Sequence, residues 1–111
     1  MLRTIKASSE IDALFRQGRR FSRQHVMLLV RPTPPGRGPT GRVAFIAGKK
    51  LGNAVVRNRC KRVMREAVRR TGGPWRGQDV AIIARNGTGN LSPIDITHEL
   101  QVLLRHADLL S

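Results

Sequence analysis

The sequence predicts an α+β fold, a two-layer sandwich in which helices pack on a small sheet. Two observations support this prediction. Three stretches place apolar residues at helical spacing, and three shorter apolar runs are bounded by turn residues. The elements follow the order αββαβα, and the chain of 111 residues contains no internal repeat. We therefore expect residues 1–111 to form a single domain.

A short helix and a buried strand are expected first. Ser9 is placed to cap a helix that runs to Gln17, with Asp12 in the reciprocal position and Gly18 as the stop. After a basic turn, the nearly continuous apolar run from His25 to Val30 predicts a buried strand. Residues 33–41 are rich in proline and glycine, so we expect a mobile loop there.

Two further strands enclose the longest predicted helix. Arg42 to Ala47 predicts a strand, with Val43, Phe45 and Ala47 on one face and Ala44 and Ile46 on the other. Asp79 to Ala84 predicts the third strand. The helix between them covers about Val55 to Arg70 and ends before a Gly-Gly-Pro sequence.

The last element is a helix that begins after Ser92. Ser92 is the expected cap, with Asp95 as its capping-box partner, and the apolar face continues to Ala107. A short extra strand in the 33–41 loop or near Lys50 would escape these patterns.

The charge of the chain points to a polyanionic partner. Lys and Arg number 21 against seven Asp and Glu, which gives a formal net charge of +14 and a pI near 12.0. Such a charge opposes compact folding unless a polyanion such as a nucleic acid neutralises it. No apolar stretch approaches the roughly 20 residues that span a membrane, and the N-terminus has no apolar core of a secretory signal. We expect a cytoplasmic protein.

Catalysis by protein side chains is not expected. Cys60 is the only cysteine, which excludes an intrachain disulfide and a zinc cluster with cysteine spacing. The histidines are scattered, and no paired carboxylates or Ser/His/Asp arrangement stands out. The sequence therefore predicts neither catalytic nor metal-ligating residues.

The most informative segment is residues 49–66 and the turn of helix that follows. On a helical wheel one side gathers apolar residues, namely Val56, Cys60, Val63, Met64 and Ala67. The opposite side gathers polar and cationic residues, namely Asn58, Lys61, Arg62, Arg65 and Arg69. Glu66 is the only acid in this span, so the charges lack internal partners. The pattern favours a helix that packs by one face and binds RNA phosphates by the other.

Two alternatives apply within this segment. A basic face can serve solubility alone, although clustered arginines without counter-charges favour phosphate binding, since guanidinium offers a planar fork of donors. Asn53, at the junction into the helix, fits two roles, which are capping of the helix and direct contact with RNA.

The same segment resembles the signature of the bacterial ribonuclease P protein family, the RNR motif named after Arg57-Asn58-Arg59. The resemblance includes Lys49-Lys50 and Gly52-Asn53-Ala54 before it and Lys61-Arg62 and Arg65-Glu66 after it. The flanks agree, since Leu14-Phe15 with Gly18 resembles the first helix of the family and residues 79–85 resemble its apolar strand ending in Ala-Arg. The resemblance covers nearly the whole chain.

The resemblance implies a fold and a function. The implied fold has a mostly antiparallel sheet, elements in αβ(β)βαβα order and a left-handed βαβ crossover, as in domain 2 of ribosomal protein S5. The implied function is that of the protein subunit of ribonuclease P, an endoribonuclease that removes the 5′ leader of precursor tRNA. In the family the RNA subunit cuts the bond with bound magnesium ions. The implied partners are this RNA and precursor tRNA, with no membrane, and the protein is expected to be monomeric apart from the RNA.

The resemblance also carries residues onto this chain. The implied contacts with the catalytic RNA are Lys49, Lys50, Asn53, Arg57, Asn58, Arg59, Lys61, Arg62 and Arg65. The implied leader cleft, between the first helix and the sheet, involves Phe15, with Val43 and Phe45 as its floor. Phe15 lies at helical spacing from Ile11, so packing in the core is the alternative to stacking on a base. Trp75 is expected to cover the edge of the core and is left out of the site.

Composition leaves another function open. A structural or chaperoning RNA-binding protein, such as a small ribosomal protein, would share the charge, size and mixed fold. Preference for precursor tRNA over mature tRNA would separate the two. A protein nuclease acting without RNA is disfavoured because no carboxylate cluster or histidine pair is evident. Architectural DNA binding is disfavoured because no known DNA-binding motif is evident.

Overall fold

The computed structural model describes residues 4–5, 7–36 and 40–110. Part of the predicted 33–41 loop, residues 37–39, lies outside the described residues. The helices and strands are α1 (Ser8–Gln17), β1 (Arg19–Ser22), β2 (Val26–Pro32), β3 (Arg42–Ile46), α2 (Ala54–Thr71), β4 (Gln78–Ala84) and α3 (Pro93–His106). Short 3₁₀ turns cover Lys49–Leu51 and Thr88–Asn90. The predicted α+β fold is confirmed.

The sheet has the strand order β1-β2-β4-β3. β1 pairs with β2 and β2 with β4 in antiparallel fashion, whereas β3 and β4 are parallel. The mostly antiparallel sheet is therefore as expected. At the β3 edge, Thr4 forms a parallel bridge with Val43, and Ile5 N–H donates to Val43 O at 2.8 Å.

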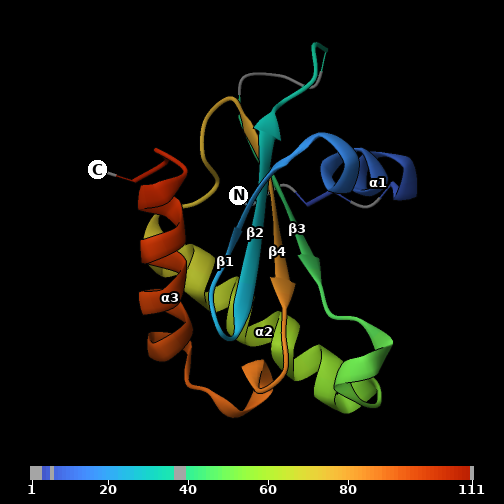
Figure 1. Cartoon of the computed structure of the whole chain (residues 1–111), viewed down its shortest axis with the longest axis vertical. Helices are drawn as coiled ribbons and strands as arrows, with labels where there is room; N and C mark the ends of the chain where they lie inside the picture. The colour runs from blue at the N-terminus through green and yellow to red at the C-terminus, as the bar shows by residue number, and fades with distance from the viewer. Residues whose placement is uncertain (1–3, 6, 37–39, 111) are drawn as a thin grey trace.

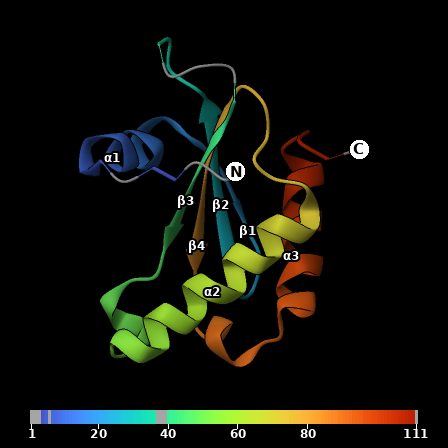
Figure 2. The same cartoon turned by 180° about the vertical axis from the view of Figure 1, so that it is seen from behind.

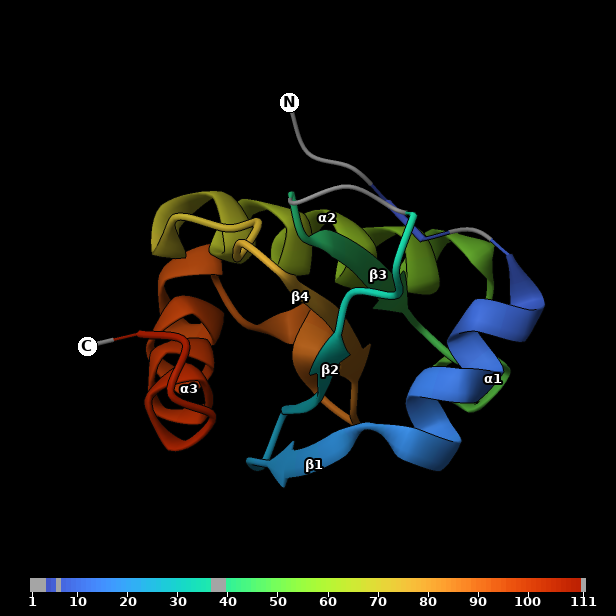
Figure 3. The same cartoon turned by 90° about the horizontal axis from the view of Figure 1, so that it is seen from above.

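α2 and α3 form a layer on one face of the sheet, and α1 lies on the other face (Figures 1 and 3). α2 connects the parallel neighbours β3 and β4. In Figure 2, seen from the α2 side, both strands run downward and β4 lies to the right of β3. With the strands running upward β4 would lie to the left, so the crossover is left-handed, contrary to the usual rule.

Two apolar clusters stabilise the fold, one on each face of the sheet. The larger joins the sheet to α2 and α3 and includes Leu28, Val43, Met64, Ile82 and Leu100, all buried. The smaller lies under α1 and consists of Ile5, Leu14, Leu29, Ala44 and Ala81. β2, β3 and β4 are thus apolar on both faces, which explains why they appear in the sequence as nearly continuous apolar runs.

Two local expectations were wrong. The residues of β1 were expected to form a basic turn, but they form the extra strand. The described part of the 33–41 loop holds no further strand, and a 3₁₀ turn forms near Lys50. α1 begins after Ala7 without a side-chain cap, so Ser9 and Asp12 do not form the expected reciprocal cap. By contrast, Ser92 and Asp95 form the predicted capping box of α3.

Candidate nucleic-acid interface

The basic helix α2 has well-defined ends. The Asn53 side-chain Oδ1 accepts a hydrogen bond from Val56 N–H at 3.1 Å, so Asn53 caps the helix. Gly72 ends it in the left-handed conformation, with φ 86°, which favours glycine. The buried side of α2 consists of Cys60, Val63, Met64, Ala67, Val68 and Thr71. The predicted apolar stripe is confirmed from Cys60 to Ala67.

The nine residues predicted to bind RNA lie on α2 and directly before it. Lys49 and Lys50 are in the 3₁₀ turn that leads to Asn53, and the other six follow on the helix. None of the nine is buried. Seven are exposed, namely Lys49, Lys50, Asn53, Asn58, Arg59, Arg62 and Arg65, and Arg57 and Lys61 are half-buried. The structure therefore brings them together on one accessible surface, which we call the α2 basic face.

The only acid on α2, Glu66, is paired with arginines near the C-terminal end of the helix. Glu66 forms ion pairs with Arg69 and Arg70, and the hydrogen bond from Arg69 lowers the pKa of the Glu66 carboxyl. Among the described residues, no ion pair is recorded for Arg57, Arg59 or Arg62. The N-terminal turns of α2 thus keep their positive charge available for an external anion.

Two arginines of this face also have local roles. The Arg65 guanidinium lies 5.1 Å from the centre of the Phe45 ring, a distance at which cation–π attraction operates. The Arg57 Nε is buried and has no hydrogen-bond partner among the described residues. Such a donor is costly to leave unpaired, so it favours an additional acceptor at this position.

The predicted floor of the leader cleft is not assembled. Val43 and Phe45 pack in the cluster with α2 and α3, on the opposite face of the sheet from α1 and Phe15. Val43 is 0% exposed, and Phe45 lies beneath Arg65. The alternation along β3 was predicted correctly, but Val43 and Phe45 were assigned to the face under α1. The structure places Ala44 and Ile46 there.

The α1 side of the sheet instead presents a different row of residues. The strand register places Ser22, Met27, Ile83 and Ile46 side by side across all four strands. Ile46 and Ile83 pack against the cluster under α1, yet both are only partly buried, as is Met27. Phe15, on α1, is 39% exposed. We call this row and Phe15 the α1-side surface.

This surface was missed because both faces of β3 and β4 are apolar. A strand buried on two sides carries no polar residue that marks the solvent side, so alternation alone cannot say which set faces α1. The one polar residue that marks the solvent side of this row is Ser22 on β1. It could not be used because β1 itself was not predicted.

A buried ion-pair network fixes α1 above the sheet. Arg42 donates to Asp79 through Nη2 at 2.7 Å and Nε at 3.2 Å, and through Nη1 to Glu10 of α1 at 2.6 Å. Asp79 is 0% exposed and also accepts from Thr33 Oγ1 at 3.0 Å. Hydrogen bonds with Asp79 raise the pKa of the Arg42 guanidinium. The network therefore ties α1 to the sheet next to the row of Ser22, Met27, Ile83 and Ile46.

Neither a metal cluster nor a membrane-spanning helix is found in the part of the chain that the structure describes. The described residues contain no group of three or more His, Cys, Asp or Glu side chains that could hold a metal ion. No helix within the described ranges is long and apolar enough to cross a membrane. Trp75 is 8% exposed and packs in the larger cluster, as expected for a residue at the core edge.

Comparisons with known proteins agree with these features. The family model for ribonuclease P matches residues 2–108. The ribonuclease P protein component of Bacillus velezensis is 33% identical over 105 residues, covering 95% of this chain and 89% of that protein. That of Symbiobacterium thermophilum is 36% identical over 107 residues, covering 96% and 91%.

Solved structures share the fold. The Staphylococcus aureus RNase P protein matches with a TM-score of 0.83 at 22% identity, covering 100% of both chains. The RNase P protein from Thermotoga maritima matches with a TM-score of 0.76 at 23% identity, covering 93% of this chain and 96% of that chain. Sequence and fold lead to one conclusion: the chain belongs to the family of bacterial ribonuclease P protein components.

Proposed function

We propose that this chain binds the catalytic RNA of ribonuclease P through the α2 basic face and the 5′ leader of precursor tRNA along the α1-side surface. The holoenzyme would then remove the leader to give the mature 5′ end of the tRNA. The observation that carries the proposal is the α2 basic face, which gathers nine accessible polar and cationic residues. The only acid of α2, Glu66, is already paired with Arg69 and Arg70.

The α2 basic face suits a folded RNA. Its arginines project from a rigid helix whose opposite side is packed in the core, so their spacing is fixed before RNA arrives. Each guanidinium can donate two parallel hydrogen bonds to a phosphate, and each contact releases condensed counterions. Such contacts position the protein without reading the base sequence.

The α1-side surface suits a single strand. Single-stranded RNA is bound by stacking of bases on aromatic rings and by cations that follow the backbone. Phe15 supplies an exposed ring and Arg20, exposed on β1, supplies a cation on the same face as Leu29. Mature tRNA lacks the leader, so this surface would favour precursor over mature tRNA.

Bond cleavage would belong to the RNA subunit and its magnesium ions. The described residues contain no cluster of carboxylates that fits a magnesium site, so no step is assigned to a metal held by the protein. The positive field of the protein would instead reduce repulsion between two RNAs and lower the magnesium concentration needed for docking. We place this complex in the cytoplasm, with one copy of the chain on the RNA.

The test is cleavage of precursor tRNA by a bacterial ribonuclease P RNA at low magnesium, with and without the protein. We expect strong stimulation that requires the RNA. A reaction with protein alone is the control. Absence of stimulation would favour a general structural or chaperoning role in RNA binding, and cleavage by protein alone would contradict both functions.

A further inference from the structure

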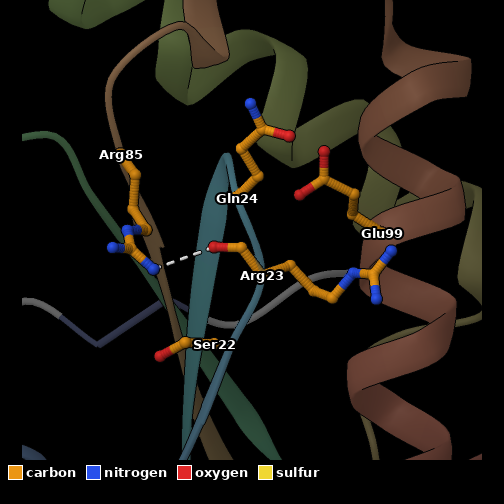
Figure 4. Close-up of a pocket in the computed structure, with 5 residues that line it drawn as sticks. All are labelled: Ser22, Arg23, Gln24, Arg85 and Glu99. Atoms are coloured by element: carbon orange, nitrogen blue, oxygen red, sulfur yellow. Dashed lines mark hydrogen bonds between the residues drawn. The ribbon is translucent and has the colours of Figure 1, made fainter.

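A polar pocket lies where the turn between β1 and β2 meets α3 (Figure 4). It is lined by Ser22, Arg23, Gln24, Arg85 and Glu99, and we call it the hairpin pocket. Its volume is about 490 Å³. Sites for small ligands span about 300–1,000 Å³, so the hairpin pocket has room for a group the size of a nucleotide.

The walls of the pocket are fixed by hydrogen bonds. Arg85 Nη1 donates to Arg23 O at 2.9 Å, which ties the turn to the end of β4. Glu99 Oε1 accepts from His25 N–H at 3.0 Å, and Glu99 Oε2 lies 2.5 Å from His25 Nδ1. Thr88 Oγ1 donates to His25 O as well. The turn is therefore held in place from β4, α3 and the 3₁₀ turn between them.

The charge of the pocket favours an anion. The pocket lining includes two arginines and one carboxylate, and both oxygens of Glu99 are already engaged by His25. Arg23 is exposed, and no hydrogen bond or ion pair of its guanidinium is recorded among the described residues. Arg85 keeps donors beyond the one that Arg23 O uses. The two guanidinium groups lie on opposite sides of the turn, Arg23 toward α3 and Arg85 away from it (Figure 4), so each offers its own fork of donors that matches a phosphate.

The position of the pocket points to RNA as the source of that phosphate. Ser22 lines the pocket and is also the β1 member of the exposed row on the α1-side surface. Arg85 follows β4 directly, two residues after Ile83 of the same row. The amide of Gln24 offers a donor and an acceptor for the edge of a base. A strand that crosses the row therefore reaches the Ser22 and Arg85 side of the pocket, and it has to pass the end of the turn to reach Arg23 (Figure 4).

We propose that the hairpin pocket binds one nucleotide of a single-stranded RNA, with its phosphate held by Arg23 and its base beside Gln24. This inference rests on the proposed function, which makes RNA the ligand. The pocket shares no residue with the α2 basic face, because its lining comes from β1, the turn that follows it, the residue after β4, and α3 (Figure 4). The phosphate belongs either to the leader or to a single-stranded part of the catalytic RNA.

Reversal of one charge tests the site in the assembled holoenzyme. Arg23→Glu is compared with wild type and with Arg76→Glu, a matched control in an exposed arginine at the opposite end of β4. Affinity is measured for the catalytic RNA alone and for precursor tRNA with a series of leader lengths. We expect Arg23→Glu to weaken one of these affinities roughly tenfold and to lower its salt slope by about 0.7, the value for one phosphate of a single strand.

The two affinity measurements show which RNA supplies the phosphate. A loss confined to precursors with long leaders assigns the phosphate to the leader, and a loss for the catalytic RNA assigns it there. If Arg23→Glu and Arg76→Glu change the affinities and salt slopes equally, the proposed nucleotide site is wrong. Because stimulation by the wild-type protein is recorded in the same assay, failure of the proposed function is seen separately.

A second readout does not depend on the variant being folded. The side-chain amide signal of Gln24 in the NMR spectrum of the wild-type chain is followed while a single-stranded oligonucleotide is added. We expect the signal to shift at saturating RNA. A signal that stays constant while signals of the α2 basic face move would contradict the proposal.

Discussion

Arg42 shows at the scale of one residue why a buried charge must keep its partners. It connects Glu10 of α1 with Asp79 of β4, and Asp79 is fully buried. Removal of Arg42 would leave the Asp79 carboxylate with Thr33 as its remaining side-chain partner among the described residues. A buried charge without its partner costs far more than an exposed pair contributes.

We therefore expect Arg42→Met to lower the free energy of unfolding by about 3–5 kcal/mol. Arg69→Met, which breaks an exposed pair with Glu66, should leave it unchanged within error. Urea unfolding of both variants measures the difference. Equal and small losses would show that the Arg42 network contributes little to stability.

Phe15 is the residue for which packing and binding make different predictions. Its neighbour Leu14 is 0% exposed, whereas Phe15 is 39% exposed. Leu14→Ala should cost about 2–5 kcal/mol of stability. Phe15→Ala should cost less and should instead reduce the preference of the holoenzyme for precursor over mature tRNA, by about 1–3 kcal/mol if one base stacks on the ring.

The measurement for Phe15 is the ratio of the two dissociation constants, with unfolding followed in parallel. An equal loss of affinity for precursor and mature tRNA would assign Phe15 to packing.

At the scale of an element, α2 combines two functions on its two sides. The apolar side anchors the helix in the core, so we expect charge reversals at Arg57, Arg59 and Arg62 to leave the fold in place. Reversal of Arg57, Arg59 and Arg62 to Glu should greatly weaken assembly with the catalytic RNA. The salt slope of binding should fall by about 0.9 for each duplex phosphate that the variant no longer neutralises.

Three exposed arginines outside α2 provide the control for this triple variant. Reversal of Arg16, Arg76 and Arg105 changes the net charge by the same amount but leaves α2 intact. Affinity for the catalytic RNA is measured over a range of salt concentrations. If both triple variants lose affinity equally, net charge rather than the pattern on α2 governs assembly.

The elements differ in how well the sequence predicts them. α2 was predicted closely because a 3.6-residue period and a glycine stop agree there, and α3 because a capping box precedes such a period. β1 was missed because its four residues are mainly exposed and only Phe21 is apolar, so its conformation depends on pairing with β2. The basic site was predictable from local pattern, whereas the α1-side surface depends on which face of β3 receives α1.

At the scale of the whole molecule, a net charge of +14 on 111 residues produces self-repulsion. Screening shortens the Debye length from about 30 Å at 0.01 M salt to about 8 Å at 0.15 M. We expect the Tm of the free protein to rise with sodium chloride over this range. A gain of about 1 kcal/mol would correspond to about 4 °C for a domain of this size.

The ionic-strength prediction is checked by calorimetry of the protein without RNA. A neutral osmolyte at matched osmolality serves as the control for general solvent effects. A Tm that falls as chloride is added would show that ion pairs such as those of Arg42 outweigh the repulsion.

The strand order has a consequence for how the chain folds during its synthesis. β4 lies between β2 and β3 in the sheet but is the last strand to be translated. At about 5–20 residues per second, roughly 2–8 s separate completion of β3 from completion of β4. Throughout that interval the inner edge of β2 and the inner edge of β3 have no partner, and unpaired apolar edges promote association between nascent chains. Aggregation on the ribosome is therefore a hazard of this strand order until the strand between β2 and β3 exists.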